Sequence, residues 1–283
     1  MALNLLEQGW PVHVCDIDAS KLPPLVQAGA VIHPNSAQTA ANTDLLIVCV
    51  VDSQQTHDVL FGPDGAVHQL KPHQAVLLCP TIAPEDVEVC ANKLSALGIH
   101  TLDAPMSGGP ARARVGSMSL MLACTDAVFE KYQDLIAALS TQVFRISQKP
   151  GDGARTKLVN NLLAAINLAG AAEVMALAER MGLDLTTTLN VIERSSGQSW
   201  IGSDRMRRAI ADDFEPLAHT TLLTKDSKLA VSAANKLGFN TPVGTQAYQT
   251  FQRAIEFGLA AEDDASLFKL MQNNNLNNNK NRL

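Results

Sequence analysis

The stretch Gly151-Asp-Gly-Ala-Arg-Thr-Lys157-Leu-Val-Asn-Asn161 divides the chain into two kinds of sequence. Before it, short apolar runs alternate with helical stretches. After it, strand signals stop, and helical patterns follow one another. The stretch opens a long helix, predicted from residue 154 to residue 181, which ends before Gly182, a residue type that commonly terminates helices. We therefore expect two domains joined by this helix.

The first half of the chain has the pattern of a parallel sheet covered by helices. Its apolar runs have strand length and little polar alternation, as in strands that are buried on both faces. Strands are predicted at residues 11–16, 45–51, 75–79, 99–104, 119–123 and 143–146, and helices at 1–8, 22–28 and 83–97. Strands that alternate with helices indicate right-handed βαβ crossovers. The fold class is thus α/β, with a doubly wound Rossmann-type domain over residues 1–150.

The second half is predicted to be all-α. Helices are expected at residues 184–194, 203–211, 217–237, 241–257 and 264–271. Thr241-Pro242 supports one of these starts, because Pro is favoured at the first helical position. We assign residues 151–271 to a substrate and dimerisation domain. The Asn-rich segment 272–283 is predicted to be a disordered tail.

Composition excludes several classes of protein. The 283 residues carry a net charge of −6, and the pI is near 5.6, so there is no basic footprint for nucleic acid. No run of about 20 apolar residues predicts a membrane span, and no signal peptide is evident, so a cytoplasmic protein is expected. The five cysteines form no C-x-x-C pair and are interpreted as buried thiols. The seven histidines show no metal-ligand spacing, so no metal site is predicted.

Lys157 and Asn161 are the first candidates for catalysis. Residues four apart lie on one face of a helix, so an amine and a carboxamide point to the same side, one turn apart. An amine that moves a proton and an amide that holds a hydroxyl or carboxylate suit a small oxygen-rich substrate. The alternative is an exposed lysine near the start of a helix.

Two residues that follow predicted strands are candidates for binding a dinucleotide. Asp16 ends an apolar strand, where an acid binds the ribose hydroxyls of adenosine, and Ile17 in place of an arginine favours NAD over NADP. Thr81 follows the strand at 75–79 and faces the nicotinamide side in this interpretation. The alternative for both is a role in capping the next helix.

Ser107-Gly108-Gly109 follows another predicted strand and is a candidate anion site. Two glycines leave backbone N–H groups open to a carboxylate, although the same residues also suit a tight turn. Lys225-Asp226 stands near the start of a predicted helix. Its lysine is interpreted as reaching the cofactor or substrate, and the alternative is a solvated surface pair.

One expected element is missing from the sequence. A phosphate-binding Gly-x-Gly-x-x-Gly turn should stand about 20 residues before Asp16, after a first strand. The chain supplies neither, and Met1–Gly9 is interpreted as the remainder of the first helix. Either a late start of the sequence or a true loss explains the gap.

Taken together, Asp103-Ala-Pro-Met-Ser-Gly-Gly109, Gly151–Asn161 and Lys225-Asp226 resemble the 3-hydroxyacid dehydrogenase family from Met1 to about Met271. The resemblance implies one set of roles for the candidate residues: Lys157 as the catalytic residue, Ser107, Gly108, Gly109 and Asn161 as substrate-binding residues, and Asp16, Thr81 and Lys225 as cofactor-binding residues.

The resemblance also implies reversible hydride transfer between NAD and a small hydroxy acid. The pattern around Trp200 and Asp204-Arg-Met206 is most similar to the branch that oxidises a four-carbon sugar acid. Two alternatives stay open: an inactive binding or scaffold protein without its phosphate loop, and a semialdehyde reductase that runs in the opposite direction. The family forms homodimers or homotetramers, so a monomer is not expected.

Overall fold

The computed structural model describes residues 1–280, with side chains as far as Asn273. The chain divides into two compact units, Met1–Lys157 and Leu158–Leu283. The division falls inside helix α8 (Asp152–Arg180), a few residues beyond the predicted boundary at 150. Over its 29 residues α8 has a length of about 44 Å.

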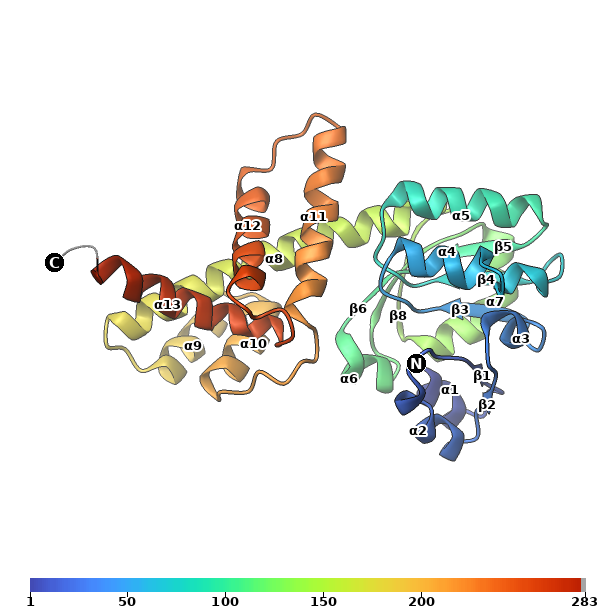
Figure 1. The fold of residues 1–283 in the computed structure, drawn as a ribbon, viewed down its shortest axis with the longest axis horizontal. Coiled ribbons are helices and arrows are strands. Elements are labelled where there is room, and N and C mark those ends of the chain that lie inside the picture. The colour runs from blue at the N-terminus through green and yellow to red at the C-terminus, as the bar shows by residue number, and fades with distance from the viewer. Residues whose placement is uncertain (281–283) are drawn as a thin grey trace. The chain divides into compact units, whose positions relative to one another are not determined.

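The first unit contains a mixed sheet of six strands (Figure 1). The strands follow the order β3-β4-β5-β7-β6, and β8 also pairs with β7. They are β3 (Leu45–Val48), β4 (Ala75–Leu78), β5 (His100–Asp103), β6 (Met106–Ser107), β7 (Ser119–Ala123) and β8 (Gln142–Ser147). Strands β3, β4 and β5 are parallel, while β7 runs antiparallel to β5. The predicted Rossmann-type fold is confirmed.

Two further strands form a separate parallel pair, β1 (His13–Val14) with β2 (Val31–Ile32). In a doubly wound sheet with the order 3-2-1-4-5-6, one more strand stands between such a pair and β3. No strand within residues 1–280 occupies that position. This gap agrees with the first strand that the sequence analysis did not find.

The sheet is covered on both faces, as its uninterrupted apolar runs predicted. Along β4 the side chains alternate: Ala75 and Leu77 belong to one core cluster, and Val76 and Leu78 belong to the other. The helical elements of this unit are α1 (Ala2–Glu7), η1 (Ala19–Lys21), α2 (Pro23–Gln27), α3 (Ser36–Ala40), α4 (Ser53–Phe61), η2 (Ala66–His68), α5 (Pro84–Ala96), α6 (Gly109–Arg114) and α7 (Asp126–Leu139).

In its described residues the second unit is helical. After α8 come α9 (Leu185–Glu193), α10 (Trp200–Ile210), α11 (Thr220–Lys236), α12 (Pro242–Glu256), η3 (Asp264–Ser266) and α13 (Leu267–Lys280). Helices α11 and α12 lie side by side (Figure 1). The core gathers around Phe251, whose side chain is fully buried, and around one face of α8 that includes Leu168 and Met175.

Helix α13 runs further than expected. The segment 272–283 was expected to be disordered, but the helix continues to Lys280, and residues 281–283 lie outside the described residues. Leu267, Phe268 and Leu270 are buried at the start of this helix. Once packing has fixed the first turns, each added residue costs little, so a polar sequence can extend the helix.

Two expectations drawn from composition need correction. By length and composition alone, helix α8 is long and apolar enough to cross a membrane, although no such run was expected. Ala165, Leu168 and Ala172 on this helix belong to the core of the second unit, so α8 is a core helix. Of the five cysteines, Cys79, Cys90 and Cys124 are buried, while Cys15 is half-buried and Cys49 is exposed.

Candidate active site

Helix α8 begins directly against the strands of the first unit, and Gly153 makes this approach possible. A Cβ atom at this position would lie 2.6 Å from the carbonyl oxygen of Met121 on β7 and 2.9 Å from the carboxylate of Asp103 on β5. Contacts that close do not occur for real Cβ atoms. Only glycine therefore lets the helix start at the carboxyl end of β5.

Asp103 holds the first turn of this helix. It is the last residue of β5 and is only 1% exposed. Its Oδ2 accepts hydrogen bonds from the backbone N–H of Gly151 at 2.7 Å and of Ala154 at 3.1 Å. The first N–H groups of a helix have no partner within the helix, so the carboxylate acts as their cap.

Lys157 and Asn161 follow Gly153 at four-residue steps and lie on the same face of α8. Both are buried, with Lys157 7% and Asn161 8% exposed. The alternative of an exposed lysine near a helix start is therefore wrong. The buried amine stands one helical turn beyond the contact between Gly153 and Asp103.

Asn161 is oriented by a residue far away in the sequence. Its Nδ2 donates a hydrogen bond of 2.6 Å to Oδ2 of Asp226 on α11, and its Oδ1 accepts one of 3.0 Å from Nδ2 of Asn160. The other oxygen of Asp226 forms an ion pair with Nζ of Lys225 at 2.7 Å. Asp226 is 8% exposed and therefore buried, while the side chain of Lys225 is partly exposed at 26%.

The Ser107-Gly108-Gly109 segment is a tight turn between β6 and α6. Ser107 pairs with Ser119 of β7, and α6 begins at Gly109. The φ angles of Gly108 and Gly109 are 129° and 69°, in the left-handed region that favours glycine. A Cβ atom on Gly108 would come within 2.7 Å of the side chain of Arg112. The two glycines are thus required by the turn, and Gly109 has no atom within 4 Å of the position that a Cβ would take.

Two of the three candidates for cofactor binding, Asp16 and Thr81, follow parallel strands, where nucleotides bind in open α/β sheets. Asp16 is exposed two residues after β1, and its Oδ1 accepts a hydrogen bond from the N–H of Asp18 at 2.9 Å. Capping of η1 falls to Asp18 rather than to Asp16. Thr81 is half-buried between β4 and α5, whose cap position is Ala83. Neither candidate is the cap of the next helical element.

The environment of Asp16 fits the ribose of NAD. An exposed carboxylate accepts hydrogen bonds from two vicinal hydroxyls, and it would repel a phosphate on the same ribose. Ile17, the next residue, is fully exposed and offers no positive charge to such a phosphate.

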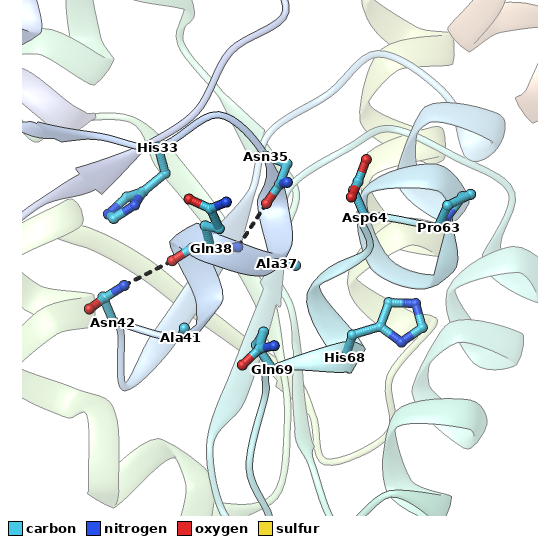
Figure 2. A pocket seen from close by; sticks show the side chains of 10 residues that line it. All are labelled: His33, Asn35, Ala37, Gln38, Ala41, Asn42, Pro63, Asp64, His68 and Gln69. Carbon is cyan, nitrogen blue, oxygen red and sulfur yellow. Dashed lines mark hydrogen bonds between the residues drawn. The ribbon is translucent and has the colours of Figure 1, made fainter.

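A separate pocket of about 590 Å³ lies in the first unit along α3 and η2 (Figure 2). It is lined by His33, Asn35, Ala37, Gln38, Ala41, Asn42, Pro63, Asp64, His68 and Gln69. None of the residues predicted for substrate or cofactor lines it. The pocket is therefore distinct from the predicted site residues at the strand ends and on α8.

Two residues of this arrangement received no role in the sequence analysis. Asp226 was noted only as the neighbour of Lys225, because its contact with Asn161 joins positions 65 residues apart. Asp103 was read as the start of the Ser107–Gly109 motif. Its position after an apolar strand was the available signal, since the carboxyl ends of parallel strands carry the functional residues of α/β sheets.

A doubly wound domain with an exposed acid after β1, continued by a long helix with a buried lysine into a helical domain, is the architecture of a nicotinamide-dependent dehydrogenase. Residues 1–147 match the family described as the NAD binding domain of 6-phosphogluconate dehydrogenase. Residues 151–271 match the one described as the NAD-binding domain of NADP-dependent 3-hydroxyisobutyrate dehydrogenase. The chain belongs to the 3-hydroxyisobutyrate dehydrogenase-like family of NAD-dependent hydroxyacid dehydrogenases.

Individual relatives agree with this assignment. The chain is 34% identical over 270 residues to an L-threonate dehydrogenase of Cupriavidus necator, covering 95% of this chain and 91% of the relative. It is 31% identical to an NAD-dependent L-serine dehydrogenase of Pseudomonas aeruginosa, covering 95% and 93%. A crystal structure of 3-hydroxyisobutyrate dehydrogenase from Salmonella typhimurium superimposes with a TM-score of 0.90 at 33% identity, covering 95% and 94%.

Proposed function

We propose that this chain oxidises L-threonate or a similar four-carbon sugar acid with NAD, using Lys157 as the acid–base group. The observation that carries the proposal is the burial of Lys157 and Asn161 one turn apart on α8, directly after the contact of this helix with β5. The name of the relative from Cupriavidus necator supports the choice of substrate.

Each of the proposed site residues has a defined task in the reaction. Bound NAD supplies the acceptor for the hydride. Lys157 takes the proton of the substrate hydroxyl during oxidation and returns it during reduction. Asn161 holds the same hydroxyl, and its carboxamide is kept in one orientation by Asp226.

Two further groups bind the substrate and the nicotinamide side of the cofactor in this proposal. The backbone N–H groups of Ser107, Gly108 and Gly109 receive the substrate carboxylate, and the space beside Gly109 is open. Thr81 and Lys225 contact the nicotinamide side. The ion pair of Lys225 with Asp226 supports its assignment, because it links Lys225 to the residue that orients Asn161.

Asp16 binds the adenosine ribose in this proposal and makes NAD the preferred cofactor. Its exposure and the absence of a basic residue at position 17 support that preference. The carboxylate would accept hydrogen bonds from the 2′- and 3′-hydroxyls.

We further propose that the chain is a cytoplasmic homodimer or homotetramer. The support is a row of exposed apolar side chains along α8 and just beyond its end: Val159, Leu163, Val174, Leu177 and, one residue after the helix, Met181. Their spacing of three, four or eleven residues keeps them near one face of the helix. A contiguous apolar face of this kind is typical of a protein–protein contact. Size-exclusion chromatography with light scattering tests this proposal, and a mass near the 30.2 kDa of one chain would contradict it.

A substrate panel tests the proposed reaction. C3 and C4 hydroxy acids, each as separate stereoisomers, are offered with NAD and with NADP, and the corresponding carbonyl acids are offered with NADH. We expect the highest kcat/KM for L-threonate with NAD. Preference for a C3 semialdehyde with NADH would instead support the reductase alternative. Absence of NAD binding in a calorimetric titration would contradict the cofactor assignment itself.

A further inference from the structure

We propose that Asp103 is a positioning residue that fixes Lys157 relative to the Ser107–Gly109 turn. The inference rests on the proposed acid–base role of Lys157 and goes beyond it, because Asp103 joins the strand that leads into the turn to the helix that carries the lysine. One carboxylate thereby sets the distance between the group that moves the proton and the turn that receives the substrate.

The position of Asp103 is fixed from both sides. It is the last residue of β5, where it pairs with Leu78 of β4 and with Ala123 of β7. Its side chain is 1% exposed and accepts from the N–H of Gly151, just before α8, and from the N–H of Ala154 in its first turn. The helix therefore starts at a point that the sheet determines.

From Asp103 the constraint reaches Lys157 within one helical turn. Gly153 packs against the backbone and the carboxylate of Asp103, with no room even for a methyl group. Lys157 is the next residue on the same helix face. In the opposite direction along the chain, Asp103 precedes Ser107 by only four residues. A shift of the helix start by about 1 Å would displace the amine from the reacting hydroxyl, which can cost about 100-fold in rate.

The charge of Asp103 changes within an accessible pH range. Burial raises the pKa of its carboxyl to about 6, against the opposing effect of the backbone N–H donors of Ala154, Gly151 and Gly153. Asp152 on α8 adds a further negative charge that raises it. Burial raises the pKa of the Cys79 thiol, just after β4, well above its ordinary value, and the negative charge of Asp103 raises it further. At neutral pH Asp103 is an anionic cap, and near pH 5 it is protonated.

The direction of this pKa shift distinguishes a loss of positioning at acid pH from unfolding of the protein. The native pKa lies above the ordinary value of 3.8, so protonation favours the folded state. The contribution of Asp103 to stability is fully present below the ordinary pKa and is lost as the pH rises through about 6. Acidification should consequently lower turnover through Asp103 while its contribution to stability increases.

The test compares Asp103→Asn with Asp184→Asn. Asp184 is the matched control, because it caps α9 by accepting from the N–H of Thr187 at 2.7 Å, and α9 carries no proposed site residue. Steady-state kcat with L-threonate and NAD is measured from pH 5 to pH 9. Backbone hydrogen exchange of residues 151–157 is measured over the same range, without cofactor.

For the wild type and for Asp184→Asn we expect kcat to fall about tenfold through an apparent pKa near 6. Protonation of Asp103 should also lower the exchange protection of residues 151–157, after correction for intrinsic rates, because a neutral carboxyl is a weaker hydrogen-bond acceptor than a carboxylate. Asp103→Asn should show the low kcat and the low protection at every pH, with KM changed by less than about threefold. Wild-type exchange is informative on its own if the variant does not fold.

The inference would be overturned if Asp103→Asn kept both the fall in kcat at acid pH and the exchange protection of residues 151–157 that the wild type shows. It would also be overturned if hydrogen exchange of these residues in the wild type did not depend on pH. Lys157→Ala distinguishes this failure from a failure of the proposed function. If Lys157→Ala retains turnover, the acid–base assignment is wrong. If Lys157→Ala is inactive while Asp103→Asn behaves as wild type, only the positioning role is wrong.

Discussion

Asn161 donates a hydrogen bond of 2.6 Å to the carboxylate of Asp226, although 65 residues separate the two in the chain. Both side chains are buried, and Asp226 also forms an ion pair with Lys225. A buried amide that donates to a charged acceptor is held in one orientation. The carbonyl oxygen of Asn161 is therefore kept on the side away from Asp226.

Replacing Asn161 by alanine should weaken substrate binding more than it slows chemistry. Loss of an oriented hydrogen bond of this kind corresponds to about 1 kcal/mol, which is a rise in KM of roughly fivefold. Michaelis parameters for L-threonate check this. Asn167→Ala, two turns further along α8, is the control and should change KM little. Wild-type kinetics for Asn161→Ala would mean that the amide does not contact the substrate.

Lys157→Ala should abolish most turnover and leave the protein folded. Removal of a positioned acid–base group lowers kcat by at least about 100-fold. The exposed Lys228 on α11 provides the control, since Lys228→Ala removes an equal charge from a residue outside the proposed site. Circular dichroism and kcat are measured for both variants. A Lys157→Ala variant within a few-fold of wild type would exclude this lysine as the proton carrier.

Asp16→Ala should reduce the preference for NAD over NADP. Without the carboxylate, the ribose hydroxyls lose their acceptor, and a 2′-phosphate is no longer repelled. We expect the ratio of the dissociation constants, measured by calorimetry, to move toward unity by about tenfold. Asp18→Ala is the nearby control, because Asp18 is also an exposed acid but caps η1. An equal effect of both substitutions would indicate a nonspecific influence of charge.

Two glycines of α8 should respond to alanine in opposite ways. Gly153→Ala places a methyl group against the carbonyl of Met121, which belongs to the backbone of β7 and cannot move aside. We expect a loss of several kcal/mol, as in overpacked cores, together with reduced kcat. Gly170→Ala meets no atom within 4 Å and should raise stability by up to about 1 kcal/mol. Thermal unfolding of the two variants is the measurement, and equal destabilisation would contradict the close contact at Gly153.

The strands of the first unit were predictable because burial on both faces produces continuous apolar runs. β7 was predicted with its observed ends, and β3, β4 and β5 within three residues. The short helices α1 and α2 were predicted, but α3 and α6, with five and six residues, were not, since they show no helical period. Helix α7 was also overlooked, although Val128, Tyr132 and Ile136 are buried at four-residue steps and carry the signal of an amphipathic helix.

In the candidate site, the features that depend on local spacing were predictable from the sequence, and those that depend on tertiary contacts were not. Lys157 and Asn161 were placed on one face because four-residue spacing fixes that relationship in any helix. Their burial depends on packing and could not be read from the sequence. A solvated surface pair was the alternative for Lys225-Asp226, since adjacent Lys and Asp residues usually are solvated, and only the folded chain brings Asp226 to Asn161.

The boundary between the two units falls within α8, directly after Lys157, so the proposed proton carrier and its partner amide belong to different units while sharing one unbroken helix. The rise per residue then sets their separation along the axis at about 6 Å. Bending or twisting elsewhere in the chain cannot alter this interval unless the helix itself breaks. The spacing between the amine and the amide is therefore constant, and any hinge motion during turnover would have to move the two groups together.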